Sequence, residues 1–334
     1  MKKIVSILLA GALTASALTG CGKTPGGTAS GNTPLVLNEV AHSIFYAPQY
    51  AAIELGYFED EGIDLTLVNG AGADKVMTAL ISGDAQIGFM GSEASIYVYQ
   101  EGSQDYAVNF AQLTQRAGNF LVGRQPEDNF NWENLKGKKV LGGRAGGMPQ
   151  MVFEYILKKH GLDPKTDLSI DQSINFGLTA AAFTSNDADY TVEFEPFATT
   201  LERESSGTVV ASLGTESGYV PYTAYCAKKS YIEKNPELIQ KFTNAIQKGM
   251  DYVNSHSSEE IAKIIAPQFK ETPVDKIATI VGRYKDQDTW KDDTIFEKES
   301  FELLENILEE AGELSERVSY ENLVTTQFSE ASVK

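Results

Sequence analysis

Residues 63–90 read IDLTLVNGAGADKVMTALISGDAQIGFM, and this stretch indicates the fold class. Apolar and polar residues alternate over 63–68, which is typical of a β-strand. After a glycine-rich loop, Asp74 is placed to cap a helix that Gly83 ends, and a second short strand follows at 86–90. A strand, a helix and a strand in this order predict a parallel α/β sheet.

The same alternation extends on both sides of this stretch. Upstream, residues 35–37 predict a short strand, and Pro48 begins a helix that ends at Gly56. Downstream, the apolar pattern predicts strands at 120–122, 138–141, 168–171 and 190–194 and helices at 151–160 and 178–183. From residue 222 the pattern changes to helices, with amphipathic spacing over 236–253 and 301–311.

The length and the composition limit the classes of protein to consider. A chain of 334 residues with 42% hydrophobic residues is long enough for two compact units and is not wholly disordered. The formal net charge of −18 argues against a nucleic-acid binder and against docking on anionic lipid by charge. Only 2 Cys are present, so the chain is not a disulfide-stapled scaffold.

The N-terminus predicts an exported lipoprotein. Two lysines precede an uncharged, mostly apolar run over 4–18, which is typical of a secretory signal peptide and short for a membrane-spanning helix. The run ends in Leu18-Thr19-Gly20-Cys21, which resembles the lipobox of bacterial lipoproteins. That resemblance implies removal of residues 1–20, a lipid on Cys21, and an extracytoplasmic protein anchored to the bacterial cell membrane through the lipid only. Residues 21–34, rich in Gly and Thr, would form a flexible tether. A plain signal peptide and an uncleaved anchor are the alternatives.

Sequence patterns for catalysis or metal binding are absent. The 3 His lie in unrelated contexts, and no HExxH, CxxC or GxSxG pattern occurs, so we expect no metal site, no cofactor and no catalytic residue. The loop Gly142-Gly143-Arg144-Ala145-Gly146-Gly147 fits neither the P-loop nor the dinucleotide-binding pattern. It lies between a predicted strand and a predicted helix, so its backbone N–H groups either face a ligand or only form a tight turn.

Several polar and aromatic residues follow predicted strands, where α/β proteins usually bind their ligands. Glu193 and Glu195 lie at the end of the strand 190–194, and alternation places both on one side while the chain stays extended. These carboxylates would accept hydrogen bonds from an amino-bearing ligand, act as an acid/base pair, or simply be solvated. The candidates at equivalent positions are His42, Phe45, Tyr46, Ser92 and Glu93. Aromatic residues there would stack on a flat ligand or pack within their loops.

Five short motifs follow one another along the chain. They are Ala52-x-x-x-Gly56-Tyr57-Phe58-x-x-x-Gly62-Ile63, ALISGDAQIG at 79–88, NLKGKKV at 134–140, Glu195-Pro196 and Asn235-Pro236-Glu237. Together they resemble the substrate-binding proteins of ABC importers, in the nitrate/sulfonate/taurine and thiamine-pyrimidine-precursor class. One departure is Gln86, where an Asp is commoner in that class.

The resemblance implies an α/β chain with a type II periplasmic-binding-protein fold, in which two Rossmann-like lobes are joined by a two-segment hinge. The first lobe would comprise 35–118 plus 224–334 and the second 119–223, with crossings near 119–122 and 222–227. The protein would be a monomer without enzyme activity, which binds a small molecule between the lobes and delivers it to an ABC permease with a cytoplasmic ATPase. Carried over by position, the cleft would be lined by His42, Phe45, Tyr46, Gly70, Gly72, Ser92, Glu93, Gly146, Gly147, Met148, Glu193 and Glu195.

The charges of these candidate residues separate the ligand classes. Nitrate and sulfonate binders need N–H donors and positive charge, which Arg144 and the loop at 146–147 would supply, whereas Glu93, Glu193 and Glu195 oppose an anion. We therefore expect an amino-bearing heteroaromatic ligand such as a thiamine-related pyrimidine, with an alkylsulfonate, taurine or nitrate as the alternative. Two hypotheses of another class remain. One is an enzyme like the pyrimidine synthases of this fold, whose Cys-rich motif is absent here, and the other is a surface scaffold lipoprotein.

Overall fold

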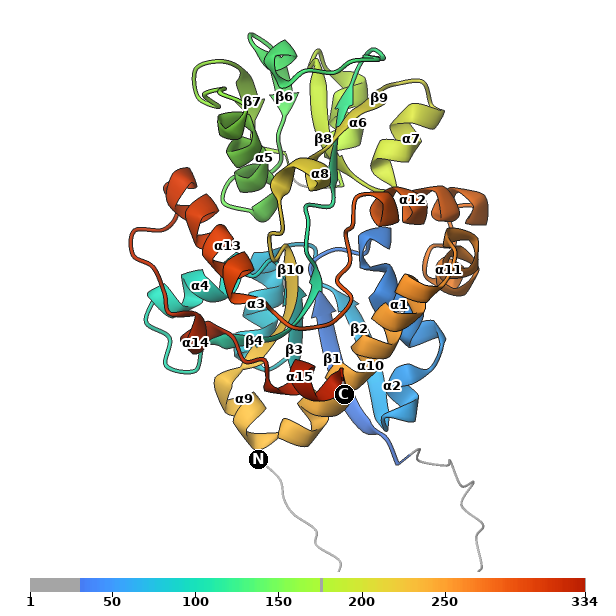
Figure 1. Cartoon of the computed structure of the whole chain (residues 1–334), viewed down its shortest axis with the longest axis vertical. Coiled ribbons are helices and arrows are strands. Elements are labelled where there is room, and N and C mark those ends of the chain that lie inside the picture. The colour runs from blue at the N-terminus through green and yellow to red at the C-terminus, as the bar shows by residue number, and fades with distance from the viewer. Residues whose placement is uncertain (1–30, 175–176, 334) are drawn as a thin grey trace, which may run out of the picture. The chain divides into compact units, whose positions relative to one another are not determined.

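Two five-stranded sheets form the framework of the computed structural model (Figure 1), which describes residues 31–174 and 177–333. The predicted signal peptide and Cys21 lie outside the described residues. The first sheet has the order β2-β1-β3-β10-β4, formed by β1 (Thr33–Glu39), β2 (Ile63–Asn69), β3 (Ile87–Met90), β4 (Ala107–Thr114) and β10 (Thr223–Lys228). The second has the order β7-β6-β8-β5-β9, formed by β5 (Asn119–Gly123), β6 (Lys139–Leu141), β7 (Ser169–Asp171), β8 (Tyr190–Phe194) and β9 (Thr208–Ser212).

The strand–helix–strand prediction for residues 63–90 is confirmed. β2 and β3 flank the helix α3 (Ala73–Ser82), and β1 pairs in parallel with both strands. Asp74 does not cap α3 as expected, because Gly72 is the N-cap, with φ of 140° and no side-chain cap hydrogen bond. Gly83 ends the helix in a left-handed conformation, as predicted.

The expectation of parallel sheets is wrong for β10 and β5, and the expectation of helices after residue 222 is wrong for β10. β10 lies between β3 and β4 and runs antiparallel to both. Its residues from Thr223 to Ala227 are all buried, since a central strand is covered on both faces. A short buried run of this kind shows no alternation, so its period does not distinguish a strand from a helix.

The second sheet contains the four strands predicted within 119–223 and β9, which was not predicted. β6 pairs in parallel with β7 and β8, whereas β5 runs antiparallel to β8 and β9. The helices of this part are α5 (Met148–Lys159), α6 (Thr179–Ser185), α7 (Phe197–Arg203) and α8 (Leu213–Ser217). α5 begins earlier than predicted because Pro149 fits the first turn of a helix, where no backbone N–H is needed.

The remaining helices surround the first sheet and connect it to the second (Figure 1). Before β10 they are the 3-10 helix η1 (Ile44–Tyr46), α1 (Ala47–Glu54), α2 (Tyr57–Asp60) and α4 (Glu93–Gln100), whereas the 3-10 helix η2 (Trp132–Leu135) lies between β5 and β6 of the second sheet. After β10 they are α9 (Lys229–Lys234), α10 (Pro236–Ser255), α11 (Ser258–Ile265), η3 (Ala266–Gln268), α12 (Val274–Asp286), α13 (Lys298–Ala311), α14 (Tyr320–Leu323) and α15 (Gln327–Ser332). Within 31–174 and 177–333, no helix combines the length and the apolar character needed to cross a membrane.

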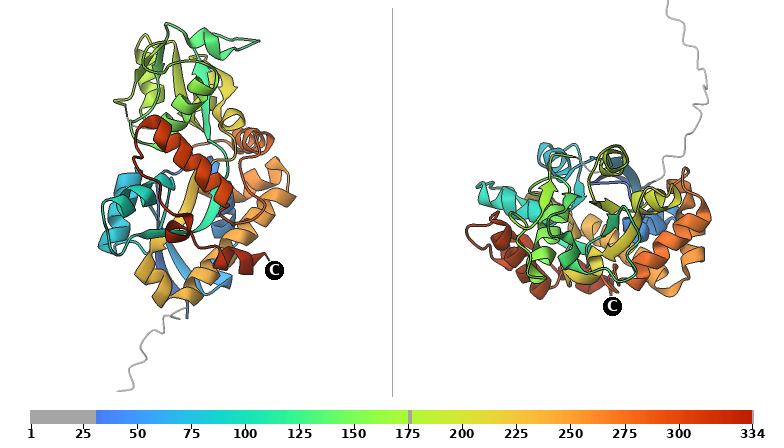
Figure 2. Two further views of the ribbon diagram at one scale, coloured as in Figure 1. Left: turned by 60° about the vertical axis from the view of Figure 1, so that its left-hand side comes forward. Right: turned by 90° about the horizontal axis from the view of Figure 1, so that it is seen from above.

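The chain passes between the two sheets at 115–118 and again at 218–222, just before the crossings expected from the sequence. α12 holds the first of these segments, because Tyr284 Oη donates to the Gly118 carbonyl (3.1 Å) and Gln287 Nε2 donates to the Ala117 carbonyl (3.0 Å). Arg283 of the same helix donates to Glu195 Oε1 at 2.7 Å, just after β8. One C-terminal helix therefore connects a crossing segment to the second sheet. The left view of Figure 2 shows the second sheet, in green and yellow, above the first sheet.

Two helical glycines differ sharply in the space around them. In α10, a Cβ on Gly249 would lie 2.3 Å from the Pro48 carbonyl oxygen and 2.9 Å from Ala52 Cβ, both of α1. In α12, a Cβ on Gly282 would meet only Ser258 Oγ, at 3.6 Å. The first glycine allows α1 and α10 to approach closely, whereas nothing nearby requires the second.

We predict that Gly249→Ala destabilises the protein by about 1–3 kcal/mol, because a backbone oxygen cannot move aside as a side chain can. Gly282→Ala serves as the matched control and should stabilise by about 0.5–1 kcal/mol through helix propensity alone. Urea unfolding of residues 22–334 measures both changes. Equal effects of the two substitutions would show that the α1–α10 contact is looser than described.

Candidate functional site

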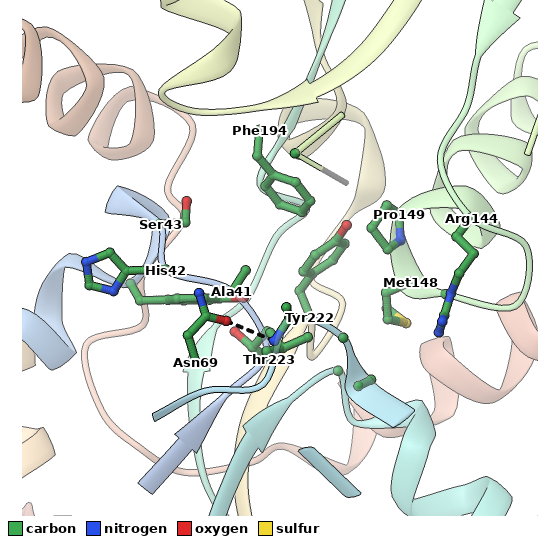
Figure 3. Close-up of a pocket in the computed structure, with 18 of the residues that line it drawn as sticks. Ala41, His42, Ser43, Asn69, Arg144, Met148, Pro149, Phe194, Tyr222 and Thr223 are labelled. Atoms are coloured by element: carbon green, nitrogen blue, oxygen red, sulfur yellow. Dashed lines mark hydrogen bonds between the residues drawn. The ribbon is translucent and has the colours of Figure 1, made fainter. Parts of the chain in front are cut away.

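A cavity of about 500 Å³ lies between the two sheets (Figure 3). Its lining comes from segments after β1, β2 and β3 of the first sheet, from the segment before α5, and from the end of β8. Val40 to Ser43 follow β1, Gly91 and Glu93 follow β3, and Gly147 to Pro149 begin α5. The carboxyl ends of strands from both sheets thus converge on one cavity, which is where open α/β sheets usually bind ligands.

Eight of the twelve residues expected to line the cleft do line this cavity. They are His42, Tyr46, Gly72, Glu93, Gly147, Met148, Glu193 and Glu195. Their contact with a ligand stays a prediction, because a place in the lining does not by itself show binding.

The other four expected residues do not line this cavity. Phe45 is fully buried and its ring packs against those of Tyr222 and Tyr284. Ser92 Oγ donates to the Pro221 carbonyl, and the Gly146 N–H donates to the side chain of Gln150. At Gly70, a Cβ would lie 2.6 Å from Asn38 Oδ1, so this glycine allows close packing behind the lining.

Other lining residues were not predicted from the sequence. Asn69 is the last residue of β2, Phe194 is the last residue of β8, and Thr179 is the first residue of α6. Tyr222 and Thr223 reach the cavity where the second crossing enters β10. Asn69 and Phe194 end predicted strands, so the rule that ligands bind at strand ends could have identified them. Tyr222 directly precedes β10, which was not predicted, so the rule could not identify it.

Glu193 is a buried carboxylate on β8, with only 1% of its surface exposed. Its Oε2 accepts a hydrogen bond from Thr179 Oγ1 (2.9 Å), and its Oε1 accepts one from Thr191 Oγ1 (2.6 Å). Desolvation raises the pKa of this carboxyl to about 7, although both threonine hydroxyls lower it. Among the described residues no cation forms an ion pair with Glu193, which lines the cavity.

Glu195 differs from Glu193 in its hydrogen-bond and charge partners. Alternation predicted that the two side chains would lie on the same side of an extended strand. β8 ends at Phe194, so the alternation does not reach Glu195. The Glu195 carboxylate instead accepts hydrogen bonds from the Thr199 backbone N–H (2.9 Å) and from Arg283 Nη1 (2.7 Å). Glu195 lines the cavity as Glu193 does, but its charge is neutralised by Arg283, and a contact of the two carboxylates with a ligand stays a prediction.

Glu93, the first residue of α4, is a second buried carboxylate in the lining, at 3% exposure. No described residue forms a hydrogen bond with its Oε2. Desolvation raises the pKa of this carboxyl to about 7, while its own backbone N–H, the Met148 N–H and the Arg144 guanidinium lower it. Arg144 itself forms an ion pair with Asp74, at 3.3 Å from Nη1 to Oδ1.

His42 lies at the edge of the cavity in a network of its own. Its Nε2 lies 2.9 Å from the Gln268 carbonyl oxygen, and its Nδ1 lies 2.8 Å from Glu39 Oε1. Because a carbonyl only accepts, Nε2 carries a hydrogen, and the Glu39 carboxylate favours a second hydrogen on Nδ1. The hydrogen bond to Glu39 raises the pKa of His42, which favours the imidazolium. Tyr50 Oη also donates to Glu39, at 2.9 Å. His42 is thus held by protein groups through both ring nitrogens.

Aromatic rings form much of the remaining wall. Figure 3 shows Phe194 and Tyr222 close together beside the pocket, and Tyr46 lines it as well. Tyr222 Oη donates to Asn119 Oδ1 (2.6 Å), so its ring is held in place. Flat apolar walls of this kind, with two buried carboxylates between them, suit a planar ligand that carries N–H groups.

Comparisons with known proteins agree with this geometry. The family model described as NMT1/THI5 like matches residues 44–260. YtlA of Bacillus subtilis, a protein named as a binding protein, is 45% identical over 298 residues, which cover 89% of each chain. A 4-amino-5-hydroxymethyl-2-methylpyrimidine phosphate synthase of Saccharomyces cerevisiae is 23% identical over 226 residues, or 63% of each chain. The chain therefore spans less than two thirds of the synthase.

Solved structures of low sequence identity share the fold. The alkanesulfonate-binding protein SsuA of Xanthomonas axonopodis pv. citri, bound to MOPS, has a TM-score of 0.70 at 14% identity, covering 88% of this chain and 98% of its own. A Candida albicans protein, CA3427, with the generic periplasmic binding protein fold, has a TM-score of 0.67 at 14% identity, covering 88% of this chain and 96% of its own. The predicted α/β periplasmic-binding fold is confirmed. By its family match and its identity with YtlA, this chain belongs to the NMT1/THI5-like family.

Proposed function

We propose that this protein is an extracytoplasmic solute-binding lipoprotein, which captures a small molecule between its lobes and delivers it to an ABC importer permease. The ligand class that we propose is an amino-bearing heteroaromatic, such as a thiamine-related pyrimidine. The observation that carries this choice is Glu193, a buried carboxylate in the cavity lining with no cation of the described chain paired to it. Domain closure over the ligand would complete its burial.

The chemistry of Glu193 favours a hydrogen-bond donor. A desolvated carboxylate is stabilised by N–H groups, and an amino group beside a ring nitrogen presents donors in the plane of the ring. The rings of Tyr46, Phe194 and Tyr222 supply flat contact area for such a ring. An anion in the same place would face an unpaired negative charge, which is costly in a buried site.

An alkylsulfonate, taurine or nitrate is the alternative ligand, because SsuA has a similar fold and binds alkanesulfonates. For such a ligand, Arg144 and the start of α5 would supply positive charge and N–H donors. Arg144 is already paired with Asp74, and Glu93 lies beside it in the lining. We therefore rank this ligand class second.

An enzyme of the pyrimidine-synthase kind is the hypothesis of another class, since the yeast relative carries that name. The chain lacks the Cys-rich motif that those synthases share, and we propose that it is not an enzyme. A surface scaffold lipoprotein would have no use for a cavity lined by buried carboxylates.

We predict that an amino-substituted pyrimidine raises the melting temperature of residues 22–334 by a few degrees. A ligand at 100 times its dissociation constant adds about 2.7 kcal/mol if it binds only the native state. The screen should include alkylsulfonates, taurine and nitrate. A shift with those anions alone would contradict the ligand class and keep the solute-binding function.

Replacing Glu193 by Gln should weaken that binding about 10- to 100-fold, since a buried hydrogen bond to a charged group contributes about 1.5–3 kcal/mol. Isothermal titration calorimetry measures the loss. Glu204→Gln, at an exposed carboxylate of the same part of the chain, is the matched control and should bind as the parent does. An unchanged affinity in Glu193→Gln would remove this carboxylate from ligand recognition.

The ligand-free protein should lose stability as the pH rises, because of the buried Glu193. Its pKa in the folded protein, about 7, lies above the ordinary value of 4.5, so the folded state binds the proton more tightly. The stabilisation is complete below pH 4.5 and is lost as the pH rises through about 7. A shift of this size corresponds to about 3 kcal/mol. Glu193→Gln should therefore gain stability relative to the parent between pH 5 and pH 8, measured by urea unfolding. Parallel stability curves would contradict a raised pKa.

Membrane attachment is predicted to depend on Cys21 alone. Cys21→Ala should leave the precursor without lipid and shift the protein from the membrane fraction to the soluble fraction of cells. Metabolic labelling with a fatty acid, followed by fractionation, measures this. Continued membrane association of an unlabelled Cys21→Ala protein would favour the uncleaved anchor.

A further inference from the structure

The N-terminus of α5 faces the cavity without a side-chain cap of its own. Gly147 is the N-cap and has no side chain, and Pro149 in the first turn has no N–H. The Gly146 N–H is taken by Gln150 Oε1, at 3.0 Å. A twelve-residue helix concentrates positive potential at such an end, which makes it a favourable place for a negative charge.

The Glu93 side chain lies at this place, although it comes from the other sheet's side of the cavity. Glu93, Arg144, Gly147 and Met148 line the same cavity. The carboxylate folds back over Gly91, where a Cβ would lie 2.1 Å from Glu93 Oε2. The chain therefore keeps room for this carboxylate by having no side chain at position 91.

The Glu93 carboxylate is surrounded like a bound anion, but the groups around it compensate its buried charge only in part. The carboxylate is 3% exposed, and within 31–174 and 177–333 its Oε2 has no hydrogen-bond partner. The Met148 N–H and the Arg144 guanidinium both favour its charged form, but desolvation outweighs them. The site thus has a built-in negative charge that is nine-tenths buried and directed at a helix N-terminus.

We infer that Glu93 is an internal anion, which lies where an anionic group of a ligand would otherwise bind and so makes the cavity reject oxyanions. This inference rests on the proposed solute-binding function, because it concerns which solutes the cavity accepts. It assigns Glu93 a role in specificity that differs from that of Glu193. Glu193 recognises a donor on the ligand, whereas Glu93 neutralises the positive end of α5 and excludes competitors.

Removing the Glu93 charge should convert the cavity into an oxyanion site. Glu93→Gln keeps the shape of the side chain and leaves the α5 N-terminus and Arg144 without their anion. The variant should bind ethanesulfonate or inorganic sulfate on the order of tenfold more tightly than the parent, which corresponds to about 1.4 kcal/mol. Isothermal titration calorimetry and thermal shift with these two anions measure the gain.

Two control variants test whether the gain in anion binding depends on the position of the removed carboxylate or only on the net charge of the protein. Glu204→Gln makes the same chemical change at an exposed site and should gain nothing. Glu193→Gln removes a buried charge elsewhere in the cavity, and an equal gain in this variant would overturn the inference, because position would then not matter. Gly91→Ala provides a second route, since its methyl group would displace the carboxylate and should also favour anion binding.

The outcomes distinguish this inference from the proposed function. No gain of anion binding in a cooperatively folded Glu93→Gln protein overturns the inference, whatever the parent binds. Tight sulfonate binding by the parent also overturns it, and would leave the importer function standing with the other ligand class. A gain of anion binding in Glu93→Gln supports the inference even if no aminopyrimidine binds the parent.

Discussion

Two carboxylates, Glu93 and Glu193, are kept from water in one cavity, and the free energy of that desolvation determines what the cavity can accept. Both have a pKa raised to about 7 by burial, so the ligand-free protein carries the cost of two poorly compensated charges. Such a cost persists in a protein when a bound partner offsets it. In the function that we propose, the same property that destabilises the empty cavity gives a donor-bearing ligand its advantage over an anion.

The fold supplies the cavity by crossing twice between two sheets. The segments at 115–118 and 218–222 connect strands whose carboxyl ends converge on the cavity, and α12 attaches to the first of them through Tyr284 and Gln287. Arg283 on the same helix neutralises Glu195. A C-terminal helix thus both supports the crossing and neutralises one of the three expected carboxylates.

Most of the framework could be predicted from the sequence, because its strands and helices carry clear periods and clear ends. The segment 63–90 and helix α10 are examples, with alternating residues in one and helical spacing in the other. The prediction missed β4, β9 and β10, and in β4 and β10 the burial of nearly every residue leaves no alternation to mark a strand. The cavity residues could be predicted where they follow strand ends, as with His42 and Glu93. The pairing of Glu195 with Arg283 could not, since 88 positions separate the two residues and only the fold brings them together.

The crystal structure of the protein with its bound solute would test the central claim most directly, namely that buried carboxylates select a ligand carrying N–H donors. The account predicts a ligand nitrogen about 3 Å from a Glu193 carboxylate oxygen, with Glu93 still directed at the N-terminus of α5. An oxyanion of the ligand against the Met148 N–H, with the Glu93 side chain displaced from the cavity, would contradict it.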